Sequence, residues 1–256
     1  MNKIYLASKM IGDAYSDQII NQNDNITSWL AHKLKHTFGV AHDIMDILYN
    51  EKELFNFLTP QEKELVELSA ILHDLGRFYQ HRDGRHLTNK EFDHGAYAVK
   101  VLKDNPNFNN PILLFAIEEH NQIAIRYDNP YFTNLSEHDK KVADITAKLL
   151  RDADKLENIK QFTFEGYPKL TYDILNEPMS DYVRDCILHD SQVSNLIIKN
   201  TVDRIVGCLT WVFDIYYEAT RSQVRALNYI EHGIAVAKKY GATDDDCKIL
   251  SEHIKV

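Results

Sequence analysis

The peptide that decides the fold is AILHDLGRFYQ, residues 70–80, where a histidine and an aspartate stand side by side. From Pro60 onward, leucines recur every three or four residues and predict a helix that arrives at this pair. Adjacent helical residues point about 100° apart. His73 and Asp74 could therefore supply an imidazole and a carboxylate to a metal ion from one side, with other helices completing the shell. The alternative is a solvated or capping pair at a helix end.

The chain on both sides of this peptide also shows apolar residues at helical spacing. Nine glycines and six prolines are few for a sheet-rich protein of this size, and no stretch alternates convincingly between apolar and polar residues. The sequence therefore predicts an all-α fold. The expected helices cover 26–49 with Thr27 or Ser28 as N-cap, 60–75, a segment after the N-cap Asp93, a segment from Pro111, 136–159, 182–188, 202–217, 223–239 and 244–254.

The domain organisation is predicted to be simple. The 256 residues, 44% of them hydrophobic, suffice for one large core. Residues 161–180 are predicted to form an irregular connection, but they lack the polar composition of a flexible linker. We therefore expect one domain over 1–256, with a core at about 26–160 and a helical extension at about 180–256.

The charge balance and the cysteines exclude several classes of protein. With 29 basic and 38 acidic residues the net charge is −9, which disfavours nucleic acid and anionic membranes as partners. Three widely separated cysteines predict neither disulfides nor a zinc knuckle. No signal peptide is visible, nor an apolar run of about 18 residues. The expectation is a cytoplasmic protein without a membrane partner; an assembly of identical copies remains open.

Further histidines and acids lie at positions that call for an explanation. His36 lies at the edge of an apolar helix face, where a histidine is ordinarily half-buried and hydrogen-bonded. His94 begins one predicted helix and His120 ends another. Asp152 lies on the main apolar stripe of the helix 136–159, and Asp154 lies on its flank. Because buried carboxylates are costly unless paired or bound to a metal, these two acids call for a nearby cation.

The order His36, His73-Asp74 and Asp154 resembles the H…HD…D signature of the HD superfamily, whose members are metal-dependent phosphohydrolases with all-α folds. The segments LKHTFGVAHDI, LHDLGR and RDADKLENI resemble the parts that carry the signature. The segments DHGAYAVKVL and AIEEHN are similar to the additional histidine segments of members with a second metal site. These matches lie within about 26–160. Further along the chain, the segment TVDRIVGCLTWVFDIYYEAT resembles the helical tail of bacterial HD proteins without an assigned substrate.

The resemblance implies a set of metal ligands. They are His36, His73, Asp74 and Asp154, with His94 and His120 for a second ion. Helical phase places Asp152 closer to the buried stripe, but the family's ligand position corresponds to Asp154, which we favour. Asp152 could then orient a ligand histidine. Mixed imidazole and carboxylate ligands suit one or two ions of Mn, Fe, Ni, Co or Zn.

The implied activity is hydrolysis of a phosphoester, by a phosphomonoesterase or phosphodiesterase acting on a nucleotide or another small phosphorylated metabolite. The metal would activate water to hydroxide and polarise the phosphoryl group, with Asp74 bridging two ions if two bind. Arg77 and Lys155 are candidates to neutralise phosphate charge, although each could equally be a solvated side chain. His94 and His120 could instead contact the phosphate or transfer a proton to the leaving group.

Three points remain open in the sequence. The loop QHRDGRH, residues 80–86, could form a lid or a wall of the substrate site, with His81, Arg82, Arg85 and His86 as candidates. The same ligands could instead serve a di-iron oxygenase, which needs six protein ligands and two irons. A third possibility is a non-catalytic nucleotide-sensing module, which would bind a ligand without turnover.

Overall fold

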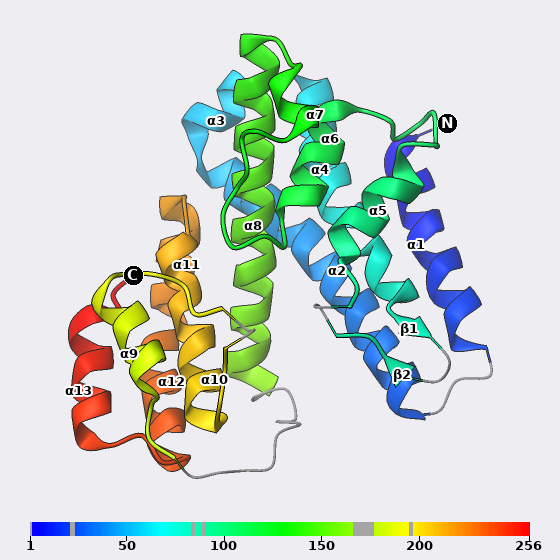
Figure 1. Ribbon diagram of the computed structural model, residues 1–256. Helices are drawn as coiled ribbons and strands as arrows, with labels where there is room; N and C mark the ends of the chain where they lie inside the picture. The colour runs from blue at the N-terminus through cyan, green and yellow to red at the C-terminus, as the bar shows by residue number, and fades with distance from the viewer. Residues whose placement is uncertain (1, 21–23, 83–84, 89–90, 166–176, 195–196) are drawn as a thin grey trace. The chain divides into compact units, whose positions relative to one another are not determined.

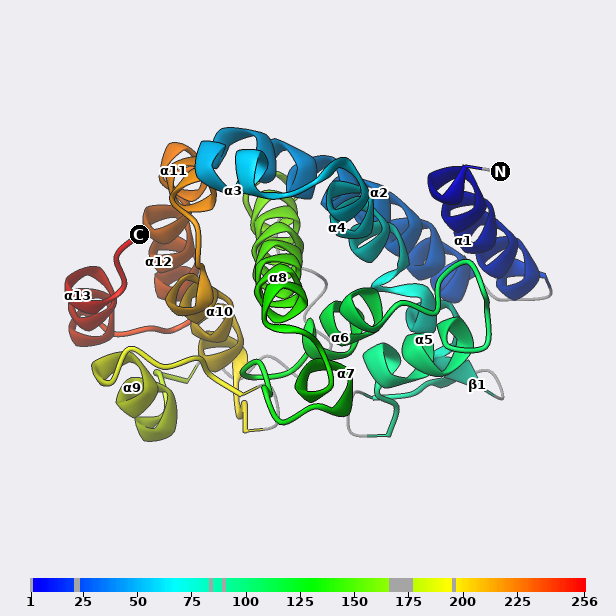
Figure 2. The same cartoon turned by 90° about the horizontal axis from the view of Figure 1, so that it is seen from above.

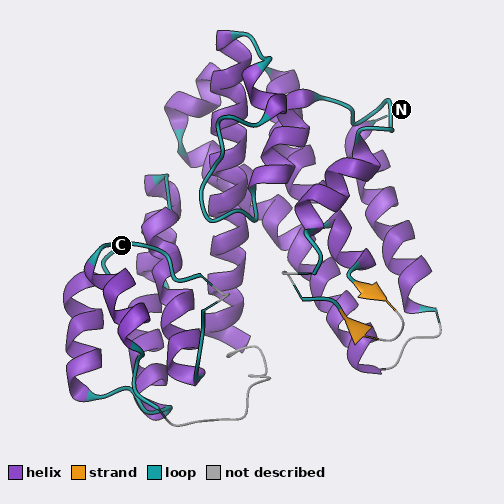
Figure 3. Ribbon diagram, viewed as in Figure 1, coloured by secondary structure: helices purple, strands orange, loops and turns teal. Residues whose placement is uncertain are grey.

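The computed structural model describes residues 2–20, 24–82, 85–88, 91–165, 177–194 and 197–256. It divides into two compact units, Met1–Glu157 and Asn158–Val256, which are treated separately below. Within the described residues, helices dominate and the strands form one two-residue antiparallel pair (Figure 3). The predicted all-α class is confirmed. Among the helices in these ranges, none combines the length and apolar character needed to cross a membrane.

The first unit holds the peptide from which the prediction started (Figure 1). Its elements are α1 (Lys3–Ile19), α2 (Asp24–Asn50), α3 (Lys52–Phe57), α4 (Pro60–Leu72), the 3-10 helix η1 (Leu75–Tyr79), β1 (His81–Arg82), β2 (Arg85–His86), α5 (His94–Leu102), α6 (Pro111–Glu119), α7 (Pro130–Thr133) and α8 (Glu137–Glu165). Helix α8 begins in this unit and continues into the second.

Helix α4 lies at the centre of the first unit, in contact with α1, α2 and α6 (Figure 2). Most residues of its second half are buried: Leu68 is 1% exposed and Leu72 is 0% exposed. Helix α5 contacts both α6 and η1, the short helix that follows α4. The C-terminal end of α4 is therefore surrounded by other helices. Polar side chains buried at this end can find partners on those helices.

Local sequence signals set the starts of the helices around this end. Thr59 and Glu62 form a capping box ahead of α4, and Pro60 occupies its first turn, as predicted. Asp93 caps α5 by accepting a hydrogen bond from the Ala96 backbone, which confirms that prediction. The predicted N-cap at Thr27 or Ser28 is wrong. Helix α2 has already begun at Asp24, an acidic residue that stabilises the first turn of a helix.

Several predicted boundaries are shifted. Helix α4 ends at Leu72 instead of continuing to Leu75, because the chain tightens into η1 after Asp74. Helix α8 extends to Glu165, into the segment predicted to be irregular; the part of that segment at 166–176 lies outside the described residues. The strands β1 and β2 pair within the loop 80–86, where no strand was expected. Helix α1 was also missed.

The second unit consists of shorter helices. They are α9 (Asp181–Leu188), α10 (Thr201–Leu209), the 3-10 helix η2 (Thr210–Asp214), α11 (Glu218–Ala226), α12 (Tyr229–Lys239) and α13 (Asp244–His253). Helix α12 contacts α10, α11 and α13. The single helix predicted over 223–239 is wrong, because Asn228 adopts a left-handed conformation with φ of 49° between α11 and α12. Asparagine tolerates this conformation better than most residues do.

Candidate metal centre

His73 and Asp74 lie where α4 gives way to η1, and both are almost fully buried. His73 Nδ1 lies 2.7 Å from the backbone oxygen of Ala70. Because a carbonyl oxygen only accepts hydrogen bonds, Nδ1 carries the proton and Nε2 has a lone pair. Among the described residues Nε2 has no hydrogen-bond partner. It lies 3.7 Å from Asp74 Oδ2 and 4.0 Å from Asp154 Oδ1, which is the arrangement expected of a metal ligand.

Helix α2 brings His36 to the same place. Its Nε2 lies 2.9 Å from Asp154 Oδ1 and 3.9 Å from Asp74 Oδ2, and the side chain is 1% exposed. His36, His73 and Asp74 form a group whose ligand atoms all lie within 4.8 Å of one another. This group joins α2, the end of α4 and, through Asp154, helix α8.

A second group lies on the other side of the same aspartate. His94 begins α5 and His120 caps the end of α6, and their Nε2 atoms are 3.0 Å apart. These Nε2 atoms lie 3.4 and 3.9 Å from Asp74 Oδ1, respectively. Asp74, His94 and His120 thus form another group within 4.8 Å. The two oxygens of Asp74 face different histidine pairs, so the two groups share this carboxylate.

The electrostatics put these side chains in the protonation states that bind cations. Burial lowers the pKa of His120 to about 4, and it also lowers the pKa of His36 and of His94. Burial alone would raise the pKa of Asp74, but Lys33, His73 and Arg77 more than offset it and hold that pKa well below its usual value. Burial also raises the pKa of Asp154, but the hydrogen bond from His36 and the charge interactions with His36 and His73 together outweigh it and lower that pKa. Neutral imidazoles and ionised carboxylates are therefore ready to bind a metal at neutral pH.

Polar groups behind the histidines fix their orientation. His120 Nδ1 donates to the backbone oxygen of Ile117 at 2.6 Å, which leaves its Nε2 to face His94 and Asp74. The side-chain amide of Asn121 lies 3.3 Å from His94 Nδ1 and 2.9 Å from Asp93 Oδ1. Asn121 was not predicted to be a site residue. Its position directly after His120 was the available signal.

The structure places the Asp154 carboxylate, 25% exposed, against His36 and His73. Asp152 is fully buried on the same helix. This geometry favours Asp154 over Asp152 as the ligand, in line with the choice made from the family pattern. The suggestion that Asp152 orients a ligand histidine stays a prediction. The backbone oxygens of Ala70 and Ile117 contact the Nδ1 atoms of His73 and His120, and the Asn121 amide contacts that of His94.

The two cations predicted to bind phosphate, Arg77 and Lys155, lie beside different candidate ligands. Arg77 Nε lies 3.4 Å from Asp74 Oδ1, and the guanidinium donates to Gln80 Oε1 at 2.8 Å. Lys155 follows Asp154 on α8 and is 8% exposed, so it is not the solvated side chain that was the alternative. The side chains of His81, Arg82, Arg85 and His86 lie outside the described part of the structure, and their predicted role stays a prediction.

One cation at this centre was missed. Lys33 Nζ lies 3.1 Å from Asp74 Oδ2, and its side chain is 14% exposed. Residues three apart on a helix share a face, so the position of Lys33 before His36 was a signal visible in the sequence.

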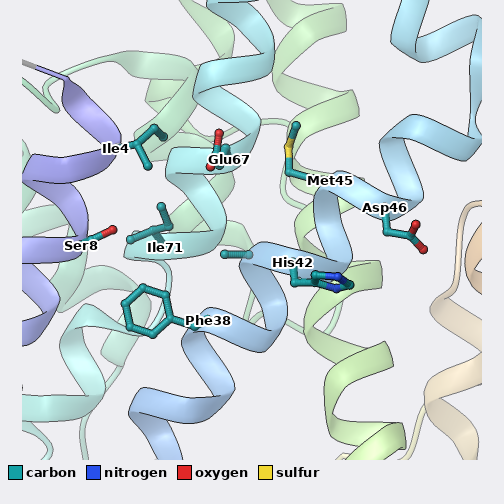
Figure 4. Close-up of a pocket in the computed structure, with 9 residues that line it drawn as sticks. Ile4, Ser8, Phe38, His42, Met45, Asp46, Glu67 and Ile71 are labelled. Atoms are coloured by element: carbon teal, nitrogen blue, oxygen red, sulfur yellow. The ribbon is translucent and has the colours of Figure 1, made fainter.

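A groove of about 500 Å³ lies elsewhere in the same unit, between α1, α2 and α4. Figure 4 shows its lining, which mixes apolar side chains such as Phe38 and Ile71 with polar ones such as His42. None of the candidate metal ligands lines this groove. The candidate metal centre is therefore not part of this groove. It is identified by the side chains that converge on Asp74.

Comparison with known proteins supports the geometry. The family model described as the HD domain matches residues 34–159, a span that contains every candidate ligand. No curated protein and no solved structure matches the chain significantly. HD domains bind divalent metals, and this donor set of imidazoles and carboxylates, with the lone pair of His73 left unpartnered, fits such an ion. On the evidence of this match and of the signature residues gathered around Asp74, the chain belongs to the HD-domain superfamily.

Proposed function

We propose that this protein is a metal-dependent phosphohydrolase that cleaves a phosphoester of a nucleotide or another small phosphorylated metabolite. The observation that supports this most is the position of Asp74, whose two oxygens face separate histidine pairs. A divalent ion bound there would activate water and polarise a phosphoryl oxygen. The proposed ligands are His36, His73, Asp74, His94, His120 and Asp154.

The residues of the chain itself would bind the phosphate and balance its charge. The Arg77 guanidinium can bind two phosphate oxygens at once, and its hydrogen bond to Gln80 holds it beside Asp74. Gln80 is in turn fixed by donating to the backbone oxygen of Leu87 at 2.7 Å. Lys155 adds a second positive charge next to Asp154. Both cations would stabilise the charge that develops on the phosphoryl group.

The roles open to His94 and His120 can be ranked. A proton donor to the leaving group works best with a pKa near the working pH. Burial lowers the pKa of His120 to about 4, so this imidazole carries no proton to donate on Nε2 near neutrality. Metal binding is therefore favoured over proton transfer for this residue. Burial also lowers the pKa of His94, which disfavours a positively charged proton donor at that position as well.

The test is an assay of purified protein on a panel of phosphoesters, after chelation and after addition of Mn, Fe, Ni, Co or Zn. We expect metal to restore hydrolysis, and Asp74→Asn and His73→Ala to reduce it by roughly 10³-fold or more. His42→Ala is the control, because this histidine is on α2 but its side chain is 80% exposed. Absence of turnover with all five metals, or full activity in Asp74→Asn, would refute the proposal.

A di-iron oxygenase is a second candidate, because six imidazole and carboxylate side chains, Asp74 among them, lie close together. This is the number of protein ligands that such a centre needs. Quantifying the metal in protein purified without added ions separates the two proposals. Two irons per chain together with oxygen consumption would favour the oxygenase, whereas metal-restored phosphate release would favour the hydrolase.

A further inference from the structure

Lys33 lies on α2 one turn before His36, and its ammonium group reaches the carboxylate shared by the candidate ligands. Nζ is 3.1 Å from Asp74 Oδ2, the oxygen that also faces His36 and His73. Lys33 and a metal ion at this group would therefore bind the same carboxylate oxygen.

The other oxygen of Asp74 has a matching arrangement. Arg77 Nε lies 3.4 Å from Asp74 Oδ1, the oxygen that faces His94 and His120. Each group of candidate ligands thus has one cationic side chain beside it. In the metal-free chain both cations pair with the Asp74 carboxylate.

Metal binding would disturb this balance. A divalent ion on Asp74 would repel the neighbouring ammonium group, and such repulsion is strong at a buried site where the effective dielectric constant is low. Lys33 has a flexible four-carbon stem and remains 14% exposed, so its ammonium group can leave Asp74. It then needs an anion, and a substrate phosphate can supply one. A phosphomonoester, whose second pKa is about 6, is largely a dianion at neutral pH and offsets the excess charge better than a monoanionic diester.

We propose that Lys33 changes partner: it pairs with Asp74 in the metal-free chain and binds a dianionic phosphate once metal is bound. This makes the centre selective for phosphomonoesters over phosphodiesters. The inference rests on the proposed function, because it concerns the substrate of the same site. It adds a substrate-binding residue and chooses between the two ester classes that the sequence left open.

The first experiment titrates Mn²⁺ into metal-free protein. Lys33→Met removes the competing charge at similar size, and Lys33→Arg retains a positive charge. Lys35→Met is the matched control, because Lys35 is exposed on the same helix. We expect Lys33→Met to bind Mn²⁺ up to about tenfold more tightly than wild type, since one competing charge is gone. Weaker Mn²⁺ binding in Lys33→Met would overturn the exchange of partners.

The second experiment measures the binding of inorganic phosphate and of dimethyl phosphate to the Mn²⁺-loaded proteins by calorimetry. Wild type should prefer inorganic phosphate, which can bind as a dianion, whereas dimethyl phosphate carries a single charge. Lys33→Met should weaken that binding by about 10- to 100-fold, the loss expected for one charge-assisted hydrogen bond. Its binding of dimethyl phosphate should change less. Lys33→Arg should retain most of the phosphate affinity, and Lys35→Met should match wild type.

The inference is overturned if Lys33→Met binds phosphate as well as wild type does, if Lys35→Met loses as much affinity, or if loaded wild type binds neither anion. Its failure is distinguishable from that of the proposed function. If phosphate affinity falls in Lys33→Met but no ester is hydrolysed with any metal, the hydrolase proposal fails while the role of Lys33 in binding phosphate stands.

Discussion

The tautomer of each histidine determines whether its Nε2 atom can bind a metal ion, as His73 illustrates. Its fully buried ring donates through Nδ1 to the Ala70 backbone, so the tautomer is set by the helix that carries it. His120 repeats the device with Ile117. In each case the acceptor is three residues earlier in the chain, at the end of a helix. Two helix ends therefore aim imidazole lone pairs at Asp74 without help from other side chains.

Gly76 has a specific steric role two residues after Asp74. A Cβ at this position would lie 2.1 Å from the backbone oxygen of His94, a clash that no side-chain rotation relieves. We expect Gly76→Ala to destabilise the metal-free protein by about 2 kcal/mol, as overpacking of a tight core does. Because the clash displaces the start of α5, it should also weaken the binding of a second metal ion at His94. Urea unfolding and metal titration measure the two effects.

The control for this variant is Gly12→Ala in α1. Apart from the neighbouring residues and backbone of its own helix, no atom of the described residues lies within 4 Å of the Cβ that this substitution would add. Replacing a helical glycine by alanine should therefore stabilise the protein, by up to about 1 kcal/mol. A Gly76→Ala protein as stable as wild type would show that the close approach of the two backbones is not needed.

The sequence predicted which residues form the centre better than how each is held there. A family pattern in the order and the helical surroundings of the residues made it possible to predict a group of His36, His73, Asp74 and Asp154. The structure brings these four side chains together. Lys33 and Asn121 were overlooked although each lies near a predicted ligand in the sequence. Their roles depend on which rotamer reaches Asp74 or His94, and short-range spacing does not specify a rotamer.

The end of α6 is held by one buried side chain from α8. Arg151, 1% exposed, donates to the backbone oxygens of Glu119 and Gln122 at 2.8 and 2.7 Å, and to those of His120 and Ile123 at 3.3 Å. The last carbonyls of a helix lack partners within it and carry partial negative charge. One guanidinium therefore caps α6, and α8 supplies both this cap and Asp154.

Arg151→Met should show that this cap positions His120. The variant removes the Arg151 donors from four carbonyl oxygens at buried or partly buried positions, so we expect a loss of about 3 kcal/mol or more in the free energy of unfolding. Lys148→Met is the control on the same helix. It removes an ion pair in which each side chain is 27% exposed, which should cost less than about 1 kcal/mol.

A metal titration separates positioning from plain stability. Arg151→Met should lose affinity at the Asp74, His94 and His120 group more than at the His36 and His73 group. Under conditions where both proteins are folded, the number of bound ions per chain should fall from two towards one. An equal loss at both groups would indicate general destabilisation instead.

At the scale of helices, the sequence predicted starts more accurately than ends. Pro60, Asp93 and Pro111 each mark an observed helix start, because capping depends on residues next to each other in the chain. The break at Asn228 and the tightening after Asp74 depend on packing between distant segments. Apolar spacing continues across both breaks, so periodicity alone predicts one helix where the chain forms two.

For the molecule as a whole, net charge and local charge point in different directions. The chain carries −9, yet Lys33 and Arg77 gather on one buried carboxylate. Overall charge acts at long range and disfavours large polyanions. A small phosphate that enters the centre meets these nearby cations instead. The acidic composition is therefore compatible with the proposed substrates.

Every candidate ligand lies in the first unit, Met1–Glu157, so the second unit contributes none of them.

The stability of the metal-free molecule should fall continuously as the pH is lowered. The pKa of His120 drops from 6.5 in the unfolded chain to about 4 in the fold, mainly through burial. Between these values the unfolded chain binds a proton that the folded chain does not, so acidification favours unfolding. This one group accounts for a loss of about 3 kcal/mol in the free energy of unfolding, because each pKa unit of difference corresponds to about 1.4 kcal/mol. Burial lowers the pKa of His36 and His94 as well, and they add to the same trend.

Urea unfolding of chelated protein from pH 7.5 to pH 4.5 measures this slope. His120→Gln should flatten it, whereas His42→Gln, at a side chain that is 80% exposed, should not. Added Mn²⁺ should raise the free energy of unfolding by about 2.7 kcal/mol at a hundred times its dissociation constant. That gain should shrink as the pH falls, because protons compete for the same imidazoles. A metal-induced gain that is equal at pH 7.5 and pH 5 would place the bound ion away from these histidines.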